Sequence, residues 1–381
     1  MNKHGWTYKK LGEVATIISG STPKTNIPEY WDGAHFWVTP AELGKSVYIG
    51  ETERTITDDA VNNTNLTLLP VGTVLLSSRA PIGKIAITTA PMYCNQGFKN
   101  IVCSEELNNK FTYYFIGHIV PYLQSLGRGA TFKEISKTIV ENVKLPVPSM
   151  EEQEAIVAEL DEINEAIAAL QQQVTDLDTL ALSTFYDMFG DPETNPKGWD
   201  VRKIGDICTL KSGDSSANNS KEGNLPYVKV ADMNLAENAD YILTSSKFVD
   251  REQNQRGVFP IGTIIFPKRG GAILTNKKRM TKVEVCCDLN VMGVIPSEVI
   301  DNIYLYQWFK IFDLSKVTSG STVLQLNNCD IAPLKISLPP LALQQEFVAK
   351  VEAMESAKAE INAQIAEMQT LLASRMDYYF D

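Results

Sequence analysis

The chain has 381 residues, a formal net charge of −11 and 44% hydrophobic residues. This length allows two ordinary domains with real cores plus connecting segments. It contains no apolar run of about 18 residues and no secretory leader pattern, so we expect a cytoplasmic protein without a membrane span. The six cysteines lack the spacing of a metal site or a disulfide framework, which favours reduced thiols.

The first elements of the chain are repeated later in it. The segment from Gly5 to Gly20 returns as the segment from Gly198 to Gly213. Pro70-Val71-Gly72-Thr73 likewise returns as Pro260-Ile261-Gly262-Thr263. The offset stays near 190 residues, so the repeating unit is a whole domain and not a short solenoid repeat.

Each copy of the repeat consists mainly of short β-rich runs that are broken by Gly, Pro, Asn and Ser. We predict strands at Val71–Leu76, Lys84–Thr88, Gly262–Phe266 and Val283–Cys287. The fold class is therefore predicted as α+β, with two similar β-rich modules, each built on a half-open sheet. The modules are expected to span residues 1–148 and 191–340.

Each module ends at prolines, after which the chain runs for dozens of residues without Gly or Pro. This change predicts two long helices, at residues 149–190 and 341–381. Their apolar residues recur at alternating spacings of four and three, which is the pattern of a coiled-coil seam. The predicted seam consists of Ile156, Leu160, Ile163, Ile167, Leu170, Val174 and Leu177 in the first helix and Phe347, Val351, Met354, Ile361, Ile365, Met368 and Leu372 in the second.

The two helices are expected to pack against each other in antiparallel orientation, as a spacer between the modules. At a rise of about 1.5 Å per residue, each would be roughly 60 Å long. Lys358 interrupts the apolar seam; its ammonium either extends to solvent or helps to fix the register of the helices. The alternative is that each helix buries its apolar face on its own module.

The negative charge is unevenly distributed along the chain. Residues 1–148 carry 14 basic and 12 acidic side chains, and residues 191–340 carry 18 and 17. The helical segment 149–190 carries no basic and 10 acidic side chains, and 341–381 carries 3 and 7. Because attraction to phosphate depends on where charges lie, the near-neutral modules remain able to approach DNA.

Several motifs together resemble the specificity subunits of type I restriction-modification systems. They are the repeated N-terminal block, the run Ser19–Pro23, the run Tyr30–Gly33 leading to Trp37–Pro40, and the module exit Leu145–Gln153. The likeness covers the whole chain. The second exit has Gln344-Gln345-Glu346 where the family has Glu-Glu-Gln, and the second module lacks the Thr22-Pro23 of the first. We therefore expect a differently shaped first loop in the second module.

The resemblance implies that each module is a target recognition domain that reads one half of a split double-stranded DNA sequence. The helices would set the number of unread base pairs between the halves. The resemblance also implies partners: two methyltransferase subunits, which would bind S-adenosylmethionine, and restriction subunits that translocate and cut DNA. The chain itself would be non-catalytic, without a cofactor or metal and without a membrane partner.

Sequence recognition requires Arg, Lys, Asn or Gln side chains on loops that reach base edges. Arg79 and Arg269 follow the repeated proline by nine residues in both modules, which indicates a common task such as gripping phosphate. Each candidate could instead be a surface charge or a loop-closing hydrogen bond. The candidate DNA-binding residues are Arg79, Asn95, Gln96, Lys99, Arg128, Thr131 and Lys133 in the first module and Lys268, Arg269, Lys277, Lys278, Arg279, Ser321, Thr322 and Gln325 in the second.

Two further residue classes have a simpler structural interpretation. The tryptophans Trp6, Trp31, Trp37 and Trp199 are expected in the cores rather than stacked on bases. The acidic residues of the first helix could be a solvated face, but they could also form a docking surface for basic partner subunits. This set consists of Glu151, Glu152, Glu154, Glu159, Asp161, Glu162 and Glu165.

Motifs for catalysis are absent from the sequence. It has no phosphate-binding G-x-x-x-x-G-K-[ST] loop, no amino-methyltransferase motif, and no acidic residue followed two places later by Lys. The spacing of His4, His35 and His118 indicates neither a metal site nor a catalytic dyad. These absences disfavour a fused restriction-modification enzyme. A non-catalytic scaffold that binds proteins through two modules is the alternative to a DNA-recognition subunit.

Overall fold

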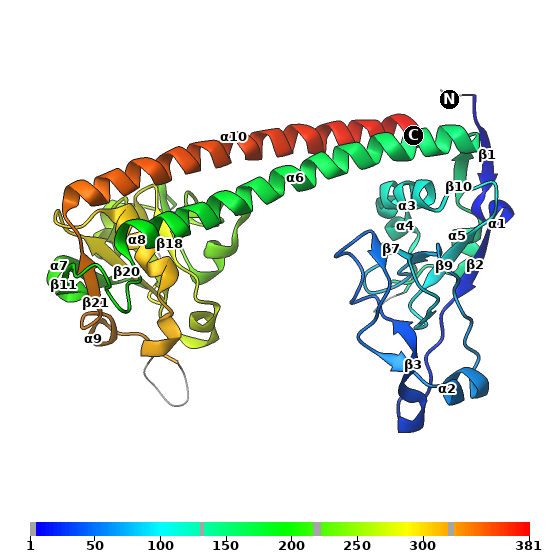
Figure 1. Ribbon diagram of the computed structural model, residues 1–381, viewed down its shortest axis with the longest axis horizontal. Coiled ribbons are helices and arrows are strands. Elements are labelled where there is room, and N and C mark those ends of the chain that lie inside the picture. The colour runs from blue at the N-terminus through cyan, green and yellow to red at the C-terminus, as the bar shows by residue number, and fades with distance from the viewer. Residues whose placement is uncertain (1–4, 130–132, 216–221, 319–323) are drawn as a thin grey trace. The chain divides into compact units, whose positions relative to one another are not determined.

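The computed structural model describes residues 5–129, 133–215, 222–318 and 324–381. The chain divides into two compact units, residues 1–171 with 363–381 and residues 172–362. Each unit contains one β-rich module and a part of each of the two long helices (Figure 1).

The first unit is built on a five-stranded sheet with the strand order β2-β9-β6-β7-β4. A three-stranded sheet, β5-β3-β8, and the antiparallel pair β1-β10 complete the module. The elements are β1 Thr7–Lys10, α1 Leu11–Val14, β2 Ala15–Ser19, η1 Pro28–Tyr30, β3 Trp31–Val38, β4 Tyr48–Ile49, β5 Thr55–Ile56, α2 Asp58–Asn63, β6 Val74–Leu76, β7 Ile85–Thr88, β8 Tyr93–Cys94, β9 Lys99–Cys103, α3 Asn109–His118, α4 Val120–Leu126, α5 Lys137–Glu141 and β10 Lys144–Val147.

The second unit has a five-stranded sheet in the order β12-β20-β17-β18-β14, a four-stranded sheet, β15-β13-β19-β16, and the pair β11-β21. Its elements are β11 Asp200–Lys203, α7 Ile204–Ile207, β12 Cys208–Ser212, β13 Leu225–Val228, η3 Val230–Asn234, η4 Ala236–Asn238, β14 Tyr241–Ile242, β15 Phe248–Val249, η5 Glu252–Gly257, β16 Val258–Phe259, β17 Ile264–Pro267, η6 Gly270–Thr275, β18 Arg279–Thr281, β19 Val285–Cys287, β20 Val291–Pro296, α8 Asn302–Ile311, η7 Leu314–Val317, α9 Asn328–Ile331 and β21 Lys335–Leu338.

The duplicated sequence therefore folds twice into a five-stranded sheet of equivalent strand order, while the smaller sheet has three strands in the first module and four in the second. The central strand of each large sheet alternates its side chains between two cores, as strand geometry requires. Val74 of β6 joins the core formed with α3, whereas Leu75 joins the core on the opposite face. Ile264 and Ile265 of β17 divide in the same way. The predicted α+β fold with an internal repeat is confirmed.

The predicted strands match observed ones with small differences at their ends. The run Val71–Leu76 was expected to be extended throughout, but β6 begins at Val74 because the preceding residues form a turn. Gly72 adopts φ 84° in this turn, and Gly262 adopts φ 83° at the equivalent place. Only glycine takes such a conformation without strain, which explains why both copies keep it.

The long helices are α6, Met150–Phe189, and α10, Leu341–Phe380. A capping pair starts α6: the Glu152 amide donates to Ser149 Oγ at 3.3 Å, and the Ser149 amide donates to Glu152 Oε2 at 2.9 Å. Within the described residues, the helices offer no segment both long and apolar enough to cross a membrane.

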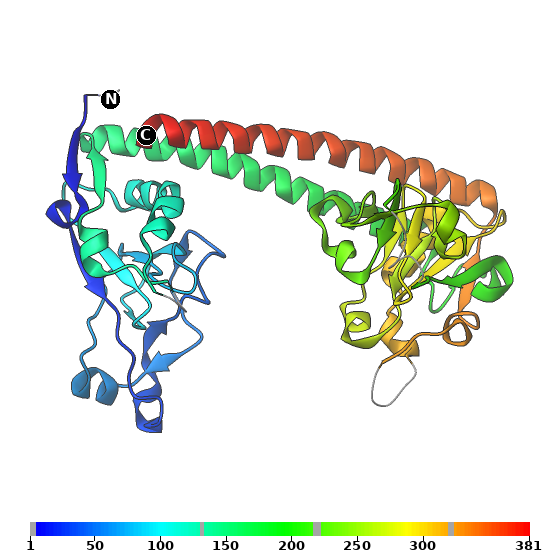
Figure 2. The same ribbon diagram turned by 180° about the vertical axis from the view of Figure 1, so that it is seen from behind.

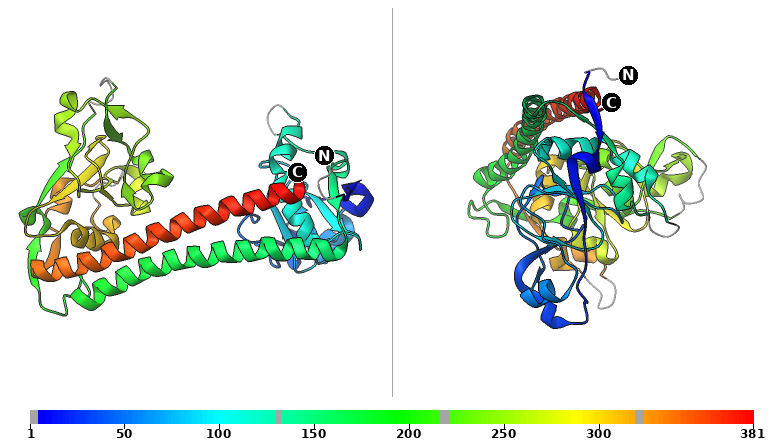
Figure 3. Two further views of the ribbon diagram at one scale, coloured as in Figure 1. Left: turned by 90° about the horizontal axis from the view of Figure 1, so that it is seen from above. Right: turned by 90° about the vertical axis from the view of Figure 1, so that its right-hand side faces the viewer.

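The two helices pack in antiparallel orientation in both units. In the first unit, Arg375 near the end of α10 forms an ion pair with Glu159 near the start of α6. Figure 2 shows the end of α10, marked C, beside the start of α6. In the second unit, the ring of Phe347 near the start of α10 lies 5.3 Å from the ring of Phe189 at the end of α6. Figure 3 shows the two helices side by side in a further view.

All predicted seam residues are buried or half-buried. Some of them, however, pack on a module as well as on the other helix. Ile156 and Leu160 belong to the core of the first module, and Phe347 and Val351 belong to that of the second. The start of each helix thus packs on the module that it follows. At these ends, therefore, each helix buries its apolar face on its own module, which was the alternative to helix pairing.

Lys358 is buried, with 3% of its surface exposed. Its Nζ lies 2.9 Å from Asp178 Oδ1 of α6, 3.4 Å from Glu355 Oε1 and 3.6 Å from Asp240 Oδ2. Burial disfavours its charged form, but these carboxylates raise the pKa of Lys358 above its ordinary value. The ammonium therefore bonds across the helix pair and does not extend to solvent.

Candidate nucleic-acid interface

Loops at one end of the five-stranded sheet meet in the first module. The Ser78 amide, just after β6, donates to Gly97 O at 2.7 Å, and the Ile135 amide donates to Ser78 O at 3.0 Å. The Ser21 amide donates to Cys94 O at 2.9 Å. A side chain at Gly20 would collide with Asn95 O, since an added Cβ would lie only 1.7 Å from it. Backbone hydrogen bonds and this close approach therefore hold the loops together.

These loops bring most of the first module's candidates into one cluster around Glu134. Its carboxylate lies 3.5 Å from Lys99 Nζ and 4.0 Å from an Arg79 guanidinium nitrogen. Its backbone exchanges two hydrogen bonds with Arg128, of 3.0 and 2.9 Å. Lys99 is almost buried, whereas 36% of the Arg79 side chain and 41% of the Glu134 side chain are exposed. The cluster is cationic and reachable from solvent.

The amide candidates take part in closing the loops. Asn95 Oδ1 accepts a hydrogen bond from the Gly97 amide at 2.8 Å. Gln96 Oε1 accepts one from the hydroxyl of Thr22. Lys133 is exposed next to Glu134. The side-chain oxygens of Asn95 and Gln96 therefore have the loop-closing role that is the alternative to a DNA contact.

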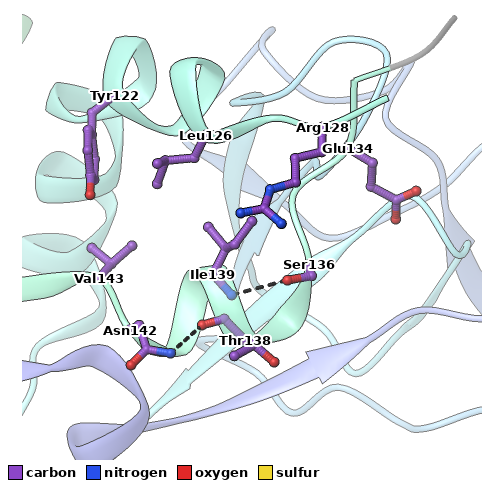
Figure 4. Close-up of a pocket in the computed structure, with 9 residues that line it drawn as sticks. All are labelled: Tyr122, Leu126, Arg128, Glu134, Ser136, Thr138, Ile139, Asn142 and Val143. Atoms are coloured by element: carbon purple, nitrogen blue, oxygen red, sulfur yellow. Dashed lines mark hydrogen bonds between the residues drawn. The ribbon is translucent and has the colours of Figure 1, made fainter. Parts of the chain in front are cut away.

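Two hollows adjoin the cluster. One, of about 470 Å³, has Arg79, Lys84 and Asn95 in its wall. The other, of about 490 Å³, lies between α4 and α5 and has Arg128 and Glu134 at its rim. In Figure 4 the guanidinium of Arg128 reaches over this second hollow, while the carboxylate of Glu134 points away from it. Glu134 is thus directed to the side of the loops where Arg79 and Lys99 lie.

The second module repeats this arrangement with different side chains. Arg269 forms an isolated antiparallel bridge with Gln325, as Arg79 does with Glu134. Lys268 Nζ donates to Ser212 Oγ at 2.8 Å, and Lys268 is buried. Burial, and next the charge of Arg269, lower the pKa of Lys268. Lys268, Arg269 and Gln325 therefore form the second cluster.

The other basic candidates of the second module bond elsewhere in the unit. Lys278 has 4% of its surface exposed, and its Nζ donates to Phe312 O at 2.5 Å and to Asn276 Oδ1 at 2.7 Å. Burial lowers the pKa of Lys278 to about 8. Arg279 Nε donates to Asn238 O at 2.7 Å, and Lys277 bonds to Asn234 Oδ1. The structure does not bring these three side chains to the Arg269 cluster.

Some candidates lie outside the described residues. They are Thr131 of the first module and Ser321 and Thr322 of the second. Residues 216–221, in the first loop of the second module, also lie outside the described residues. His4 lies outside them as well.

Two of the four tryptophans that were expected in the cores are buried there, whereas Trp6 and Trp199 are only half-buried. Trp31 and Trp37 are buried, with their rings 5.0 Å apart and nearly perpendicular. The guanidinium of Arg54 lies 3.7 Å from the ring centre of Trp31. Core packing therefore accounts for Trp31 and Trp37. The candidate surface for DNA is formed by the loops and not by these tryptophans.

His118 contacts the end of α10. Its Nε2 lies 2.9 Å from Asp381 Oδ1 and its Nδ1 3.8 Å from Asp377 Oδ1. The Phe380 ring packs on the rings of Phe111 and Phe115. These contacts attach the end of α10 to α3 within the first unit.

The acidic residues of α6 divide into two groups. Glu159 pairs with Arg375, and Asp161 accepts hydrogen bonds from Lys110 at 2.6 Å and from the Tyr114 hydroxyl at 2.5 Å. The hydrogen bond from Arg375 lowers the pKa of Glu159. The remaining members of the predicted docking set are exposed: Glu151, Glu152, Glu154, Glu162 and Glu165.

Sequence reasoning missed Glu134 and Ser212, which contact predicted candidates directly. A carboxylate repels phosphate, so Glu134 is not among the predicted candidates although it follows Lys133. The signal that could have found it is the repeat itself, since Glu134-Ile135 corresponds to Gln325-Leu326 and Gln325 was selected.

Comparison with known proteins places both modules in one family. Residues 3–177 and 196–368 each match the family described as type I restriction modification DNA specificity domain. The MjaIX type I restriction enzyme specificity subunit of Methanocaldococcus jannaschii is 30% identical over 378 residues, covering 91% of this chain and 86% of that protein.

Two solved structures share the fold. One comes from work on complex assembly and conformational transition of the type I restriction-modification system, with a TM-score of 0.65, 19% identity, and coverage of 98% of this chain and 97% of the other. The second is the type I restriction-modification S subunit from M. genitalium, with a TM-score of 0.53, 15% identity, and coverage of 100% and 97%.

Proposed function

The chain belongs to the family of type I restriction-modification DNA specificity subunits, and we propose that it reads a split DNA target in which each module recognises one half. Specificity subunits are the non-catalytic components of these systems. The observation that carries the proposal is the repeated loop cluster, in which an arginine follows the central strand and bridges to the same second loop in both modules. Two equivalent clusters on one chain suit two half-sites.

The chemistry of the clusters supports base recognition. Arginine bonds to guanine or to phosphate, and glutamine bonds to adenine, when loops hold them at the groove. The cluster in each module combines such side chains with backbone-fixed loops. In the second, Lys268 lies beside Arg269, whose side chain is exposed.

We further propose that methyltransferase subunits dock on the exposed acidic residues of α6, and that restriction subunits join the assembly. S-adenosylmethionine would then bind to the methyltransferase and not to this chain. The number of unread base pairs between the half-sites would depend on the lengths of α6 and α10. We propose a cytoplasmic location, where the DNA and these partners meet.

The test is to assemble the chain with its cognate methyltransferase and to map protected and methylated positions on DNA. We expect two short blocks of specified bases that are separated by a fixed number of unspecified ones. A protein-binding scaffold would protect no split site, and a single uninterrupted target would also contradict the proposal.

A further inference from the structure

The two loop clusters differ at one equivalent position, which is Glu134 in the first module and Gln325 in the second. We propose that this position determines a base in each half-site and makes the two modules select different bases. The inference rests on the proposed function. The Glu134 carboxylate would accept a hydrogen bond from the amino group of cytosine, and the Gln325 amide would pair with adenine.

The equivalence follows from hydrogen-bond register and not from sequence alignment alone. Arg79 bridges Glu134, and Arg269 bridges Gln325. In each module the residue that follows Glu134 or Gln325 donates a hydrogen bond from its backbone amide to the backbone oxygen of the residue that precedes the arginine. The distances are 3.0 Å from Ile135 to Ser78 O and 2.9 Å from Leu326 to Lys268 O. The same backbone arrangement therefore carries a carboxylate in the first module and a side-chain amide in the second.

A carboxylate beside DNA has no use as a phosphate grip, because it repels the backbone. Glu134 is nevertheless held in the middle of the cationic cluster, 3.5 Å from Lys99 Nζ and 4.0 Å from the Arg79 guanidinium. These contacts orient its side chain and leave 41% of it exposed. A carboxylate accepts about four hydrogen bonds, so capacity for a base amino group remains.

One residue of each bridge is an arginine in both modules, whereas the residue opposite it is a glutamate in the first module and a glutamine in the second. We therefore assign the common task, gripping phosphate or guanine, to Arg79 and Arg269. Discrimination belongs to the residue opposite. A carboxylate only accepts hydrogen bonds, whereas an amide both donates and accepts, and so the two cannot prefer the same base edge.

The experiment exchanges the two residues. The variants Glu134→Gln and Gln325→Glu are each assembled with the methyltransferase, and the bases of both half-sites are mapped with DNA that is randomised across the target. We expect Glu134→Gln to change one letter of one half-site, replacing cytosine by adenine. The expected preference at that position shifts by between about fivefold and a hundredfold, the range for one good bidentate contact. Gln325→Glu should change one letter of the other half-site in the opposite sense.

The matched control is Glu105→Gln, which removes the same charge from an exposed turn beyond the far end of β9. It should change no letter. If both exchanges leave all letters intact and alter only the salt dependence, then the position acts through charge alone and the inference is overturned, while the split target of the unchanged chain still supports the proposed function. Should Glu134→Gln unfold because Lys99 loses its partner, which a melting curve shows, the reciprocal Gln325→Glu variant decides. An unchanged chain that reads no split target overturns both.

Discussion

Arg79 and Arg269 occupy the same place in their modules but differ in the charges around them. Arg79 faces Glu134, whereas Arg269 lies beside Lys268, whose ammonium is bound by a neutral hydroxyl. With Lys99 and Arg128 included, the first cluster carries two net positive charges, and the second carries two from Lys268 and Arg269. Both clusters should therefore attract phosphate, most strongly at low salt.

Replacing either arginine tests whether the clusters contact DNA. We expect Arg79→Ala and Arg269→Ala each to weaken binding of the assembled complex to its target by about 1–3 kcal/mol. If the contact is to phosphate, the slope of log affinity against log salt should fall by about one. Binding titrations at several salt concentrations measure both effects. Lys144→Ala, which removes an exposed charge on β10, is the control, and an equal loss with that variant would contradict a specific contact.

Lys278 supports a prediction on stability and pH. Its pKa is about 8 in the folded chain, because burial disfavours the ammonium, and about 10.4 when unfolded. Between these values the unfolded chain binds more protons than the folded one, so raising the pH favours folding. The penalty for burying the charged lysine is complete below pH 8 and is relieved above it.

We expect the free energy of unfolding of the second unit, relative to a Lys278→Met variant, to rise by about 2 kcal/mol between pH 7 and pH 9.5. Denaturant titrations of both proteins at the two pH values measure the difference. Lys277→Met, which removes a positive charge from the neighbouring, half-buried position, is the control for the loss of a lysine. If the difference in the free energy of unfolding between the unchanged chain and Lys278→Met does not depend on pH, then Lys278 is not buried in its charged form at neutral pH.

The elements were more predictable than the site. Proline exits, a seven-residue apolar period and the repeat predicted α6, α10 and the two modules, because these patterns act along the chain. The site depends on which loops bond to one another, as when Ser78 accepts from Ile135. Lys278 shows the limit: its sequence neighbourhood is that of a basic surface loop, yet its ammonium is bound inside the unit by Phe312 O.

At the scale of elements, the acidic residues of α6 form two groups, one bonded within the first unit and one exposed. Glu159 and Asp161 face the rest of the first unit and bond to Arg375, Lys110 and Tyr114. Glu154, Glu162 and Glu165 are exposed. The docking face for partner subunits should therefore consist of the second group, and replacements in the first should act on folding instead.

Charge reversal separates these two roles. We expect the triple variant Glu154→Lys, Glu162→Lys and Glu165→Lys to fold normally but to bind the methyltransferase at least tenfold more weakly, because basic partner surfaces would now be repelled. Calorimetric titration and a melting curve measure the two properties. Glu360→Lys, an exposed reversal on α10, is the control for net charge. Full co-purification of the triple variant would contradict docking on α6.

At the scale of the whole molecule, the proposed recognition clusters and most of the acidic residues lie in different segments of the chain. The two modules are within two charges of neutrality, and the two helical segments account for the remaining −14. Nonspecific DNA affinity grows with the number of phosphates that are neutralised. The chain is therefore poorly equipped for indiscriminate binding, and partner subunits are better placed to supply that part of the affinity.

The dependence of target spacing on helix length can be tested by deleting one heptad from each helix. Removing Ala168–Val174 and Asn362–Met368 together keeps the seven-residue period of both seams. It also leaves in place the ion pairs Glu159–Arg375 and Asp178–Lys358, which align the helices on either side of the deletion. Seven residues of helix correspond to about 10.5 Å, or roughly three base pairs.

We therefore expect the double deletion to read the same two half-sites with a spacer that is shorter by about three base pairs, as methylation mapping would show. Deleting Ala168–Val174 alone should abolish recognition, because Asp178 and Lys358 would no longer align when Glu159 and Arg375 do. Changed letters in either half-site of the double deletion would show that the helices take part in reading bases. An unchanged spacer would show that their length does not set it.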